Sequence, residues 1–426
     1  MHFPHIKNLI FADGVGSCWQ EDIAAVRAVH KAWTPPGDRW TTPTSSNGMQ
    51  FIRQPSKVLS IGLQLDCGAT AWGDCLSVSF AGKSGRGQAM QINGARDALP
   101  AKILLDALQK LSGQRLDAAE DFLWKAFPDW NSAIRFGVSQ ALVNAVAIAN
   151  HCLASDVLKS ALGTTPVVKY QPALQGSCGH NWHDVVERMI VAGVRYLPQG
   201  QFENLGDELG ADGSKLFKYL TWLKGRIGQL GGVSLGRHES KSSPDRVITL
   251  DFHGALSQIF DGKIDLIADY IARLEEACRP FVLHVESPVA ADSFAAHLEK
   301  ITTLTAALRA RKTPVKIIAD EWANSLQEIA ILATKKAVDG IHIKMPDMGS
   351  LLDSGRAVAI CKANGLFVLL GGSCTETATS ARLAAHLAMA TGPDALLVKP
   401  GISFDEGFSL VTNELAMIQS VGNEST

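Results

Sequence analysis

The feature that most constrains the fold is a regular alternation of short apolar runs and helical patterns from about Thr165 onward. The apolar runs lie at residues 167–170, 247–250, 281–285, 315–319, 340–343, 366–370 and 395–398, and residues 189–198 contain a candidate for a further one. Helical patterns lie between them at residues 264–278, 293–311, 325–338, 351–364 and 377–390. Strands that are apolar throughout and alternate with helices predict a parallel sheet covered on both faces.

Two α/β architectures contain such a sheet. An open, doubly wound sheet that binds a dinucleotide is expected to carry a Gly-x-Gly-x-x-Gly turn after an early strand, and this sequence lacks that turn. A run of seven strands, with a candidate eighth, in roughly 250 residues matches a TIM-type (β/α) barrel. We therefore predict an α/β fold class in which residues 165–426 form such a barrel.

Residues 1–164 have a different pattern and are predicted to form an α+β domain. Residues 57–65 and 71–80 are strand-like runs on either side of a short turn that contains Gly68, which predicts a hairpin. Apolar residues recur at helical spacing in residues 133–151. Residues 33–47 are rich in Pro, Ser and Thr and are predicted to form a long loop, of the kind that often covers a site.

Composition excludes several functional classes. The 40 Lys and Arg residues nearly balance the 42 Asp and Glu residues without a basic stripe, which argues against a nucleic-acid partner. No apolar run reaches the ~18 residues of a membrane span, and the first residues lack the pattern of a secretory signal. The eight cysteines include no Cys-x-x-Cys pair, so no zinc ribbon or disulfide framework is indicated. We expect a cytoplasmic globular protein with no membrane partner.

The strongest functional signal is a set of charged residues that directly follow the apolar runs: Asp251, Glu286, Asp320 and Lys344. In a parallel barrel the carboxyl ends of all strands meet on one rim, where the active sites of such barrels lie. Carboxylates held close together raise each other's pKa, and a divalent cation removes that cost. Oxygen ligands favour Mg²⁺ over zinc.

This set predicts a reaction type. A metal held by Asp251, Glu286 and Asp320 would bind a substrate carboxylate and stabilise the enolate that forms when the adjacent carbon loses its proton. Lys344 is the candidate base, which requires that the metal or burial lower its pKa. The alternative is that each charged residue is a solvated loop residue. A single charged residue at a strand end is commonly of this kind, but charged residues at the ends of several consecutive strands are less often so.

Stretches along nearly the whole chain carry a family resemblance. In the N-terminal part they are Gly73-Asp-Cys75 and Ile134-Arg-Phe-Gly137. In the C-terminal part they are Asp269-Tyr270-Ile271, Ala319-Asp-Glu-Trp322, Ile343-Lys344 with Pro346-Asp347, Lys362-Ala-Asn-Gly365, Gly371-Gly372 with Cys374 and Glu376-Thr377, and Lys399-Pro-Gly401 with Asp405-Glu-Gly407. With these stretches the sequence resembles methylaspartate ammonia-lyase, a family of the enolase superfamily.

The resemblance implies an N-terminal α+β capping domain on an enolase-superfamily modified TIM barrel, and a homodimer. It implies that Mg²⁺ is bound by Asp251, Glu286 and Asp320. It also implies that Lys344 removes the C3 proton of L-threo-3-methylaspartate, an amino-dicarboxylate. Ammonia would then leave C2, and mesaconate would form.

The resemblance also assigns residues to substrate binding. Gln175 matches a glutamine that contacts a substrate carboxylate. Ser373 and Cys374 match a Thr-Cys pair that holds the other carboxylate. We therefore expect Cys374 to be part of the pocket wall and not a nucleophile; buried filler is the alternative for this residue.

Two positions near the predicted base depart from the family. The family carries a histidine where this sequence has Gln199, after Leu197-Pro198, and a glutamine where it has His342. Chance substitution is one explanation, but an exchange of Gln and His preserves both hydrogen-bond donors. Gln199 cannot act as a base, so proton removal from that face would be lost or passed to His342. We therefore predict a catalytic role for His342 beside Lys344, and substrate binding by Gln199 and His342.

Three further departures concern the pocket wall. Ala173 stands where the family has an aromatic residue, Leu369 where it has a tyrosine, and Ser79 where it has a glutamine. These changes predict a larger, less polar pocket and a substrate that is bulkier or less polar than methylaspartate, or lacks the amine. The alternatives to an ammonia-lyase are a dehydratase or epimerase of a different, bulkier dicarboxylic acid, and a catalytically silent ligand binder.

Two weaker motifs carry little weight. Residues 82–87, Gly-Lys-Ser-Gly-Arg-Gly, resemble a phosphate-binding loop in composition but lack its order. The family resemblance places this segment as a mobile loop of the capping domain near the substrate. His180 and His183 have the spacing of a metal pair but no third ligand nearby, so they are predicted to be surface residues.

Overall fold

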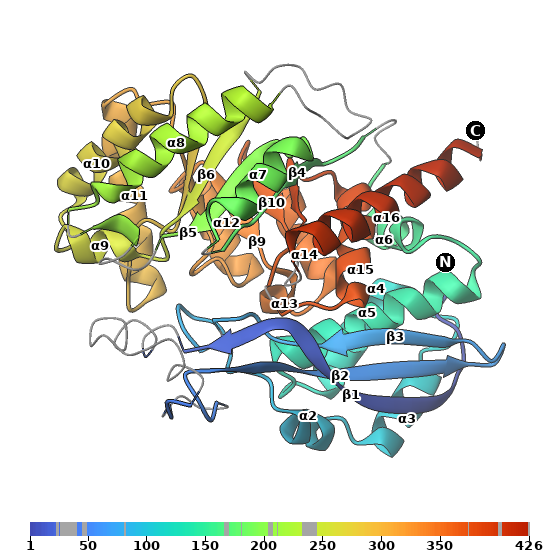
Figure 1. Cartoon of the computed structure of the whole chain (residues 1–426). Helices are drawn as coiled ribbons and strands as arrows, with labels where there is room; N and C mark the ends of the chain where they lie inside the picture. Colours follow the sequence, from blue (N-terminus) through green and yellow to red (C-terminus); the bar gives the residue numbers. More distant parts are fainter. Residues whose placement is uncertain are drawn as a thin grey trace.

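The computed structural model describes residues 1–22, 25, 41–44, 49–80, 82–165, 170–179, 181–202, 208–210, 212–231, 245–373, 375–398 and 403–424. An N-terminal domain with an antiparallel sheet is followed by a closed barrel of parallel strands (Figure 1). This is the predicted α/β architecture with a capping domain. The predicted boundary between residues 164 and 165 stays a prediction.

The N-terminal sheet contains three strands in the order β1 (Ile6–Glu21), β2 (Arg53–Leu65) and β3 (Thr70–Cys75). The predicted hairpin is confirmed, because β2 and β3 pair antiparallel from Gln64 with Thr70 to Leu59 with Cys75. It ends earlier than the apolar pattern predicted, at Cys75. Strand β1 was not predicted and pairs with β2 along most of its length.

Helices cover this sheet and connect it to the barrel. They are α2 (Ile92–Ala98), α3 (Ala101–Gln109), α4 (Leu116–Ala126), α5 (Ser132–Ala149) and α6 (Ala154–Leu162). The predicted helix at 133–151 is α5, whose first turn is capped by the Asn131 side chain. By length and composition alone α5 could cross a membrane, but 72% of it is buried, as expected for a core helix.

The close packing of α5 on the sheet depends on two glycines. A Cβ atom on Gly137 would lie 2.5 Å from the backbone nitrogen of Cys75, and one on Gly73 would lie 2.9 Å from the Cβ of Gln140. Neither position has room for a side chain. Two of the stretches that carry the family resemblance are thus explained by packing between β3 and α5.

Eight parallel strands close the barrel in the order β10-β11-β4-β5-β6-β7-β8-β9. They are β4 (Ala173–Gln175), β5 (Tyr196–Gln201), β6 (Val247–Asp251), β7 (Val282–Glu286), β8 (Lys316–Ala319), β9 (Gly340–Ile343), β10 (Phe367–Leu370) and β11 (Ala395–Leu397). Six of the predicted strands are confirmed; the run at 167–170 lies almost entirely outside the described residues. The candidate at 189–198 overlaps β5 only at its end, and β4 was not predicted.

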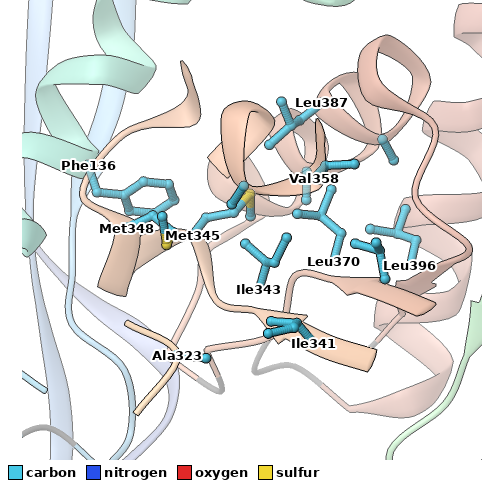
Figure 2. Packing of buried hydrophobic residues seen from close by; sticks show 14 of the residues in the cluster. Phe136, Ala323, Ile341, Ile343, Met345, Met348, Val358, Leu370, Leu387 and Leu396 are labelled. Carbon is cyan, nitrogen blue, oxygen red and sulfur yellow. The ribbon is translucent and has the colours of Figure 1, made fainter. Parts of the chain in front are cut away.

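The barrel strands alternate with helices on the outside. They are α7 (Asp184–Val191), α8 (Lys215–Leu230), α9 (Ala255–Ile259), α10 (Ile264–Cys278), α11 (Phe294–Ala310), α12 (Leu326–Thr334), α13 (Met345–Met348), α14 (Leu351–Ala363), α15 (Ala378–Thr391) and α16 (Phe404–Glu424). The five predicted helices of this part correspond to α10, α11, α12, α14 and α15. Their buried apolar stripes face the strands, as Val358 and Leu387 do beside Ile343 and Leu370 (Figure 2).

The two parts of the chain share one continuous apolar core. Phe136 of α5 lies beside Met345 and Met348 of α13 (Figure 2), and all three are buried. A second apolar cluster, which includes Tyr196, Ile318, Phe367, Leu369 and Leu397, is formed by barrel strands. The short helix α13 follows directly after Lys344, so packing by the N-terminal domain helps to fix the rim of the barrel.

Candidate active site

The charged residues predicted from the strand ends lie together on one rim of the barrel. Asp251 and Glu286 are the last residues of β6 and β7 and are paired in register. Asp320 follows β8, and Lys344 follows β9. Exposed fractions are 5% for Asp251, 3% for Glu286, 1% for Asp320 and 8% for Lys344. The strand register thus brings the predicted residues together, and their roles stay predictions.

Glu286 is held at both carboxylate oxygens. Gln199 Nε2 donates to Oε2 at 2.7 Å, and His342 Nδ1 lies 3.0 Å from Oε1. Gln175 Nε2 donates in turn to Gln199 Oε1 at 2.9 Å. The two positions that depart from the family therefore converge on one carboxylate, from β5 and β9.

Both ring nitrogens of His342 face hydrogen-bond acceptors. Nδ1 faces Glu286, and Nε2 lies 2.6 Å from the carbonyl oxygen of Gly371. A neutral imidazole donates from only one nitrogen, so these contacts fit the imidazolium form. Burial alone lowers the pKa of His342, but the charge of Glu286 and its hydrogen bond raise the pKa above the ordinary value for histidine. In this arrangement His342 donates hydrogen bonds and has no lone pair available for a proton.

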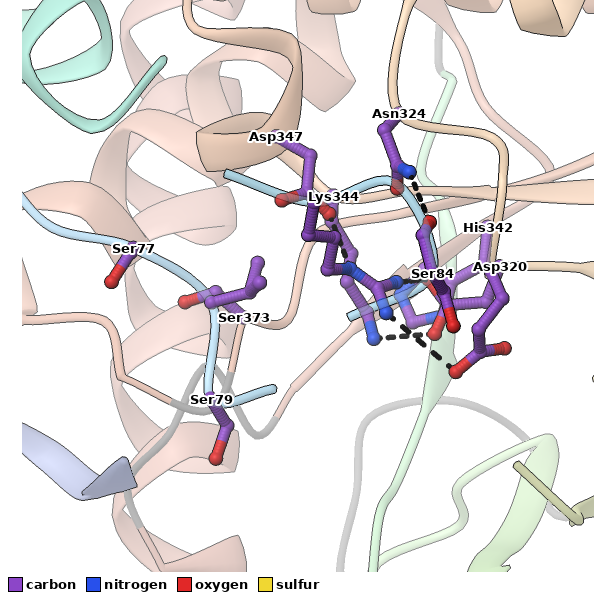
Figure 3. Close-up of polar contacts among 12 residues, drawn as sticks. Ser77, Ser79, Ser84, Asp320, Asn324, His342, Lys344, Asp347 and Ser373 are labelled. Atoms are coloured by element: carbon purple, nitrogen blue, oxygen red, sulfur yellow. Dashed lines mark hydrogen bonds and ion pairs between the residues drawn. The ribbon is translucent and has the colours of Figure 1, made fainter. Parts of the chain in front are cut away.

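Two cations share the carboxylate of Asp320. Lys344 Nζ donates to Oδ2 at 2.5 Å, and Arg86 Nη2 donates to Oδ1 at 2.7 Å (Figure 3). Burial raises the pKa of Asp320, but these cations lower it below its usual range. Burial lowers the pKa of Lys344, but Asp320 raises it above its usual range. Lys344 is therefore an ammonium ion here, and it can accept a proton only after losing one.

Arg86 is the main site residue that the sequence did not reveal. It belongs to the 82–87 loop of the N-terminal domain, and its side chain is 1% exposed. Its Nε donates to Asp347 Oδ2 at 2.8 Å, and its Nη1 lies 3.6 Å from Glu321 Oε1. An arginine in a glycine-rich loop gives no signal in one sequence for a partner 234 positions away.

A second buried histidine links Asp251 to Glu321. His253 Nε2 lies 2.9 Å from Asp251 Oδ2, and its Nδ1 lies 3.2 Å from Glu321 Oε1. Ser287 Oγ donates to the other oxygen of Glu321. Burial lowers the pKa of His253, but the two carboxylates raise it well above the ordinary value. Sequence reasoning missed His253, although its position two residues after a strand-end aspartate was a usable signal.

Backbone conformation also marks this rim. Gln199, His253, Ser287 and Trp322 have φ values of 47°, 44°, 48° and 62°. Gln199 lies within β5 where its register shifts, and the other three lie just beyond the carboxyl ends of β6, β7 and β8. Residues other than glycine adopt this region at a cost, and such residues concentrate at functional sites.

The rim contains a group that could hold a metal ion. Ligand atoms of Glu286, Asp320 and His342 lie within 4.8 Å of one another, and all three residues are buried. The predicted set has Asp251 in place of His342. Because both nitrogens of His342 are engaged, the carboxylate oxygens are the better match to Mg²⁺, which prefers oxygen ligands. The buried carboxylates therefore fit this ion, and the set Asp251, Glu286 and Asp320 stays a prediction.

Two small cavities adjoin these groups. The first has a volume of about 30 Å³; Ser79, Phe80 and Arg86 of the N-terminal domain line it together with barrel residues such as Ser373. The second, of about 10 Å³, lies against Gln175 and shares Gln199 and Glu286 with the first. Cavities of this size hold water-sized groups.

The predicted pocket-wall residues differ in what they contact. Ser373 lines the first cavity. Ser79 also lines it, but its hydroxyl donates to the backbone carbonyl of Trp19 at 2.6 Å. Leu369 lines the second cavity and is 1% exposed, and Ala173 packs against its apolar cluster. The larger pocket expected from Ala173 and Leu369 stays a prediction.

Several predictions concern residues outside the described part of the chain. They are the substrate contact of Cys374, most of the loop at 33–47, the predicted surface position of His180, and Lys399-Pro-Gly401. The predicted surface position of His183 is confirmed: it is exposed and packs beside the rings of Tyr219 and Trp222.

Fold and site together define an enolase-like barrel enzyme. The muconate lactonizing enzyme of Pseudomonas putida shares this fold, with a TM-score of 0.57 at 14% identity over 90% of this chain and 84% of that one. Family models for the N-terminus and C-terminus of methylaspartate ammonia-lyase match residues 4–163 and 166–423. The chain belongs to the methylaspartate ammonia-lyase family, which consists of carbon–nitrogen lyases.

Individual relatives agree along the full length. The methylaspartate ammonia-lyase of Citrobacter amalonaticus is 34% identical over 421 residues, 96% of this chain and 97% of the relative. A crystal structure of the Citrobacter amalonaticus enzyme containing (2S,3S)-3-methylaspartic acid has a TM-score of 0.88 at 30% identity, covering 99% of this chain and all of that one. A Mg complex of the Clostridium tetanomorphum enzyme has a TM-score of 0.85 at 27% identity, with coverage of 99% and 100%.

Proposed function

We propose that this protein is a Mg²⁺-dependent lyase that eliminates ammonia from 3-methylaspartate, giving mesaconate, or from a close analogue. One observation carries the proposal: Lys344, the candidate base, lies against Asp320 in a buried group of carboxylates at the rim of the barrel. The family match along the chain and the methylaspartic acid in a related enzyme support this choice of substrate.

Asp251, Glu286 and Asp320 would hold the metal. Bound Mg²⁺ would bind a substrate carboxylate and stabilise the negative charge that develops as the adjacent proton is removed. The other side chains complete the site. Lys344 Nζ takes the substrate proton after it has lost one of its own, and Gln199 orients the Glu286 carboxylate by donating to Oε2.

The remaining predicted residues are His342, which assists catalysis, and the residues that bind the substrate carboxylates. His342 donates hydrogen bonds next to Lys344 and acts in catalysis as a cation. Gln175, whose Nε2 donates to Gln199, contacts one substrate carboxylate. Ser373, with its neighbour Cys374, holds the other carboxylate at the wall of the first cavity.

Ammonia release from L-threo-3-methylaspartate with Mg²⁺ tests the proposal. We expect release by the intact protein and a loss of about 10²–10⁴-fold in Lys344→Ala, the usual contribution of a positioned base. Lys335→Ala is the matched control, because Lys335 is exposed on the outside of the barrel. Equal activity in both variants would exclude Lys344 as the base, and no release by folded intact protein would exclude the substrate.

A second candidate function is elimination of water from, or epimerisation of, a different dicarboxylic acid. It is favoured by Leu369, which lines the second cavity where the family carries a tyrosine. Exchange of the substrate α-proton in deuterated water distinguishes these cases from a silent binder, which would show none. Products without ammonia from a larger dicarboxylate would establish the second candidate.

The homodimer implied by the family resemblance is also part of the proposal. Light scattering on the purified protein gives the mass directly, and a mass of one chain would refute the homodimer.

A cytoplasmic location is proposed from the composition and is tested by fractionation of the producing cells.

A further inference from the structure

The 82–87 loop of the N-terminal domain is docked on the barrel by specific contacts. Asn324 Nδ2 donates to the carbonyl oxygen of Ser84 at 2.8 Å. Gly85 has a φ of 80°, and a Cβ atom there would lie 2.9 Å from Cε3 of Trp322. The glycine thus allows the loop backbone to approach the segment that follows Asp320.

The loop also has an ordered conformation of its own. The backbone N–H of Gly82 donates to the carbonyl of Gly87 at 2.6 Å, and that of Arg86 donates to Lys83 at 2.9 Å. Ser84 has a φ of 51°. These bonds close a compact turn that presents the Arg86 side chain toward the carboxylates.

The Arg86 side chain contacts three protein carboxylates. Its Nη2 and Nε donate to Asp320 and Asp347, and its Nη1 lies 3.6 Å from Glu321. Two hydrogen bonds and one ion pair thus join Arg86 to three carboxylates of the protein itself. This arrangement is that of a residue that acts through the groups it holds.

We propose that Arg86 is a positioning residue through which docking of the 82–87 loop completes the active site. It holds Oδ1 of Asp320 so that Oδ2 faces Lys344, and it ties this carboxylate to Asp347 at the start of α13. The inference rests on the proposed function, because it assumes that Asp320 and Lys344 act in that reaction.

The physical basis is the fixed fork of the guanidinium. Arginine supplies directional, charge-assisted hydrogen bonds in a planar fork, which fix the orientation of a carboxylate in a way that lysine does not. Without Arg86, three buried carboxylates would lose a shared cation and repel one another. Residues that orient metal-binding side chains in this way typically contribute 10–100-fold to affinity or activity.

The same residues connect loop position to access. Phe80 and Arg86 line the first cavity, whose volume of about 30 Å³ is too small for a dicarboxylate. Outward movement of this segment would admit substrate and withdraw Arg86 from Asp320. The site would then be complete only when the loop has closed.

Chemical rescue of Arg86→Ala tests the proposal. We expect kcat to fall about 10–100-fold at saturating Mg²⁺, with a smaller change in KM. Guanidinium at millimolar concentration should restore at least a tenth of the lost activity, whereas urea, its neutral counterpart, should not. Arg86→Lys retains the charge without the fork, so its kcat should lie between those of Arg86→Ala and the intact protein. An unchanged kcat in Arg86→Ala, or equal effects of guanidinium and urea, would overturn the proposal.

Two control variants separate positioning from loop structure. Asn324→Ala removes a loop contact but keeps the guanidinium, so guanidinium should not raise its activity. Arg96→Ala removes an arginine of the same domain whose partner is the exposed Asp13, and it should behave as the intact protein. Rescue of Asn324→Ala by guanidinium would show that the ion acts elsewhere.

Amide hydrogen exchange gives a readout independent of activity and metal. In metal-free Arg86→Ala we expect exchange within residues 82–87 to be at least tenfold faster, and guanidinium to slow it again. Unchanged exchange would overturn the proposal even in an active enzyme. If the intact protein releases no ammonia, the proposed function fails, but the exchange measurement still decides whether Arg86 holds the loop to Asp320.

Discussion

Glu120 joins the N-terminal domain to the barrel through a buried carboxyl group. It lies on α4 and is 2% exposed. Its Oε1 accepts a hydrogen bond from Ser139 of α5 at 2.5 Å, and its Oε2 accepts one from Ser350 at 2.7 Å. Ser350 caps the first turn of α14. A change in the charge of Glu120 therefore acts on the contact between the two parts of the chain.

Burial raises the pKa of Glu120 from 4.5 to about 7, and the two serine hydroxyls offset only part of that effect. The folded protein thus binds this proton more tightly than the unfolded chain does. Stability from this group is fully present below pH 4.5 and is lost as the pH rises through 7. A shift of this size corresponds to about 3 kcal/mol of the free energy of unfolding.

The substitution Glu120→Gln removes the charge and keeps the shape. We expect the free energy of unfolding of the intact protein to fall by about 3 kcal/mol more than that of Glu120→Gln between pH 4.5 and pH 8.5. Urea unfolding at a series of pH values measures this difference, and groups common to both proteins cancel in it. Glu299→Gln, at an exposed position of α11, is the control and should follow the intact protein. Parallel pH profiles for the intact protein and Glu120→Gln would refute the reasoning.

Two other predictions concern packing and the rim. Gly137→Ala should lower stability by about 1–3 kcal/mol or more, because its Cβ would lie 2.5 Å from the Cys75 nitrogen. Gly225→Ala, which meets no atom within 4 Å, should not destabilise; equal melting temperatures for the two variants would contradict this account. The double variant Gln199→His with His342→Gln should retain more ammonia-lyase activity than the product of the two single effects predicts. Strictly additive effects would show that the two positions act independently.

The rim of the site was predictable because it depends on local sequence and one general rule. Each apolar run specifies a strand, and the residue after it is at the carboxyl end. The register of β6 with β7 then places Asp251 beside Glu286 without further information. The same reasoning placed Lys344 one strand beyond Asp320.

Features that depend on contacts between distant segments were not predictable in this way. Strand β1 pairs with β2 across an intervening segment, and its own pattern does not specify that pairing. Arg86 reaches Asp320 only because the N-terminal domain packs on the barrel through α5 and α13. Strand β4 is three residues long, too short for a pattern to emerge.

The exchange of glutamine and histidine on either side of Glu286 limits the chemistry that the rim can support. The number of donors to this carboxylate is kept, since Gln199 Nε2 and His342 Nδ1 each bond one oxygen. The position of the positive charge differs from the family pattern, because the imidazolium of His342 lies on β9, two residues before Lys344. Gln199 has no basic group, and His342 donates from both nitrogens, so of these three residues Lys344 is the candidate to take a proton once its ammonium group has lost one. Epimerisation requires proton transfer on both faces of the reacting carbon, whereas elimination requires a base on only one. Among the functions considered, the geometry therefore favours elimination.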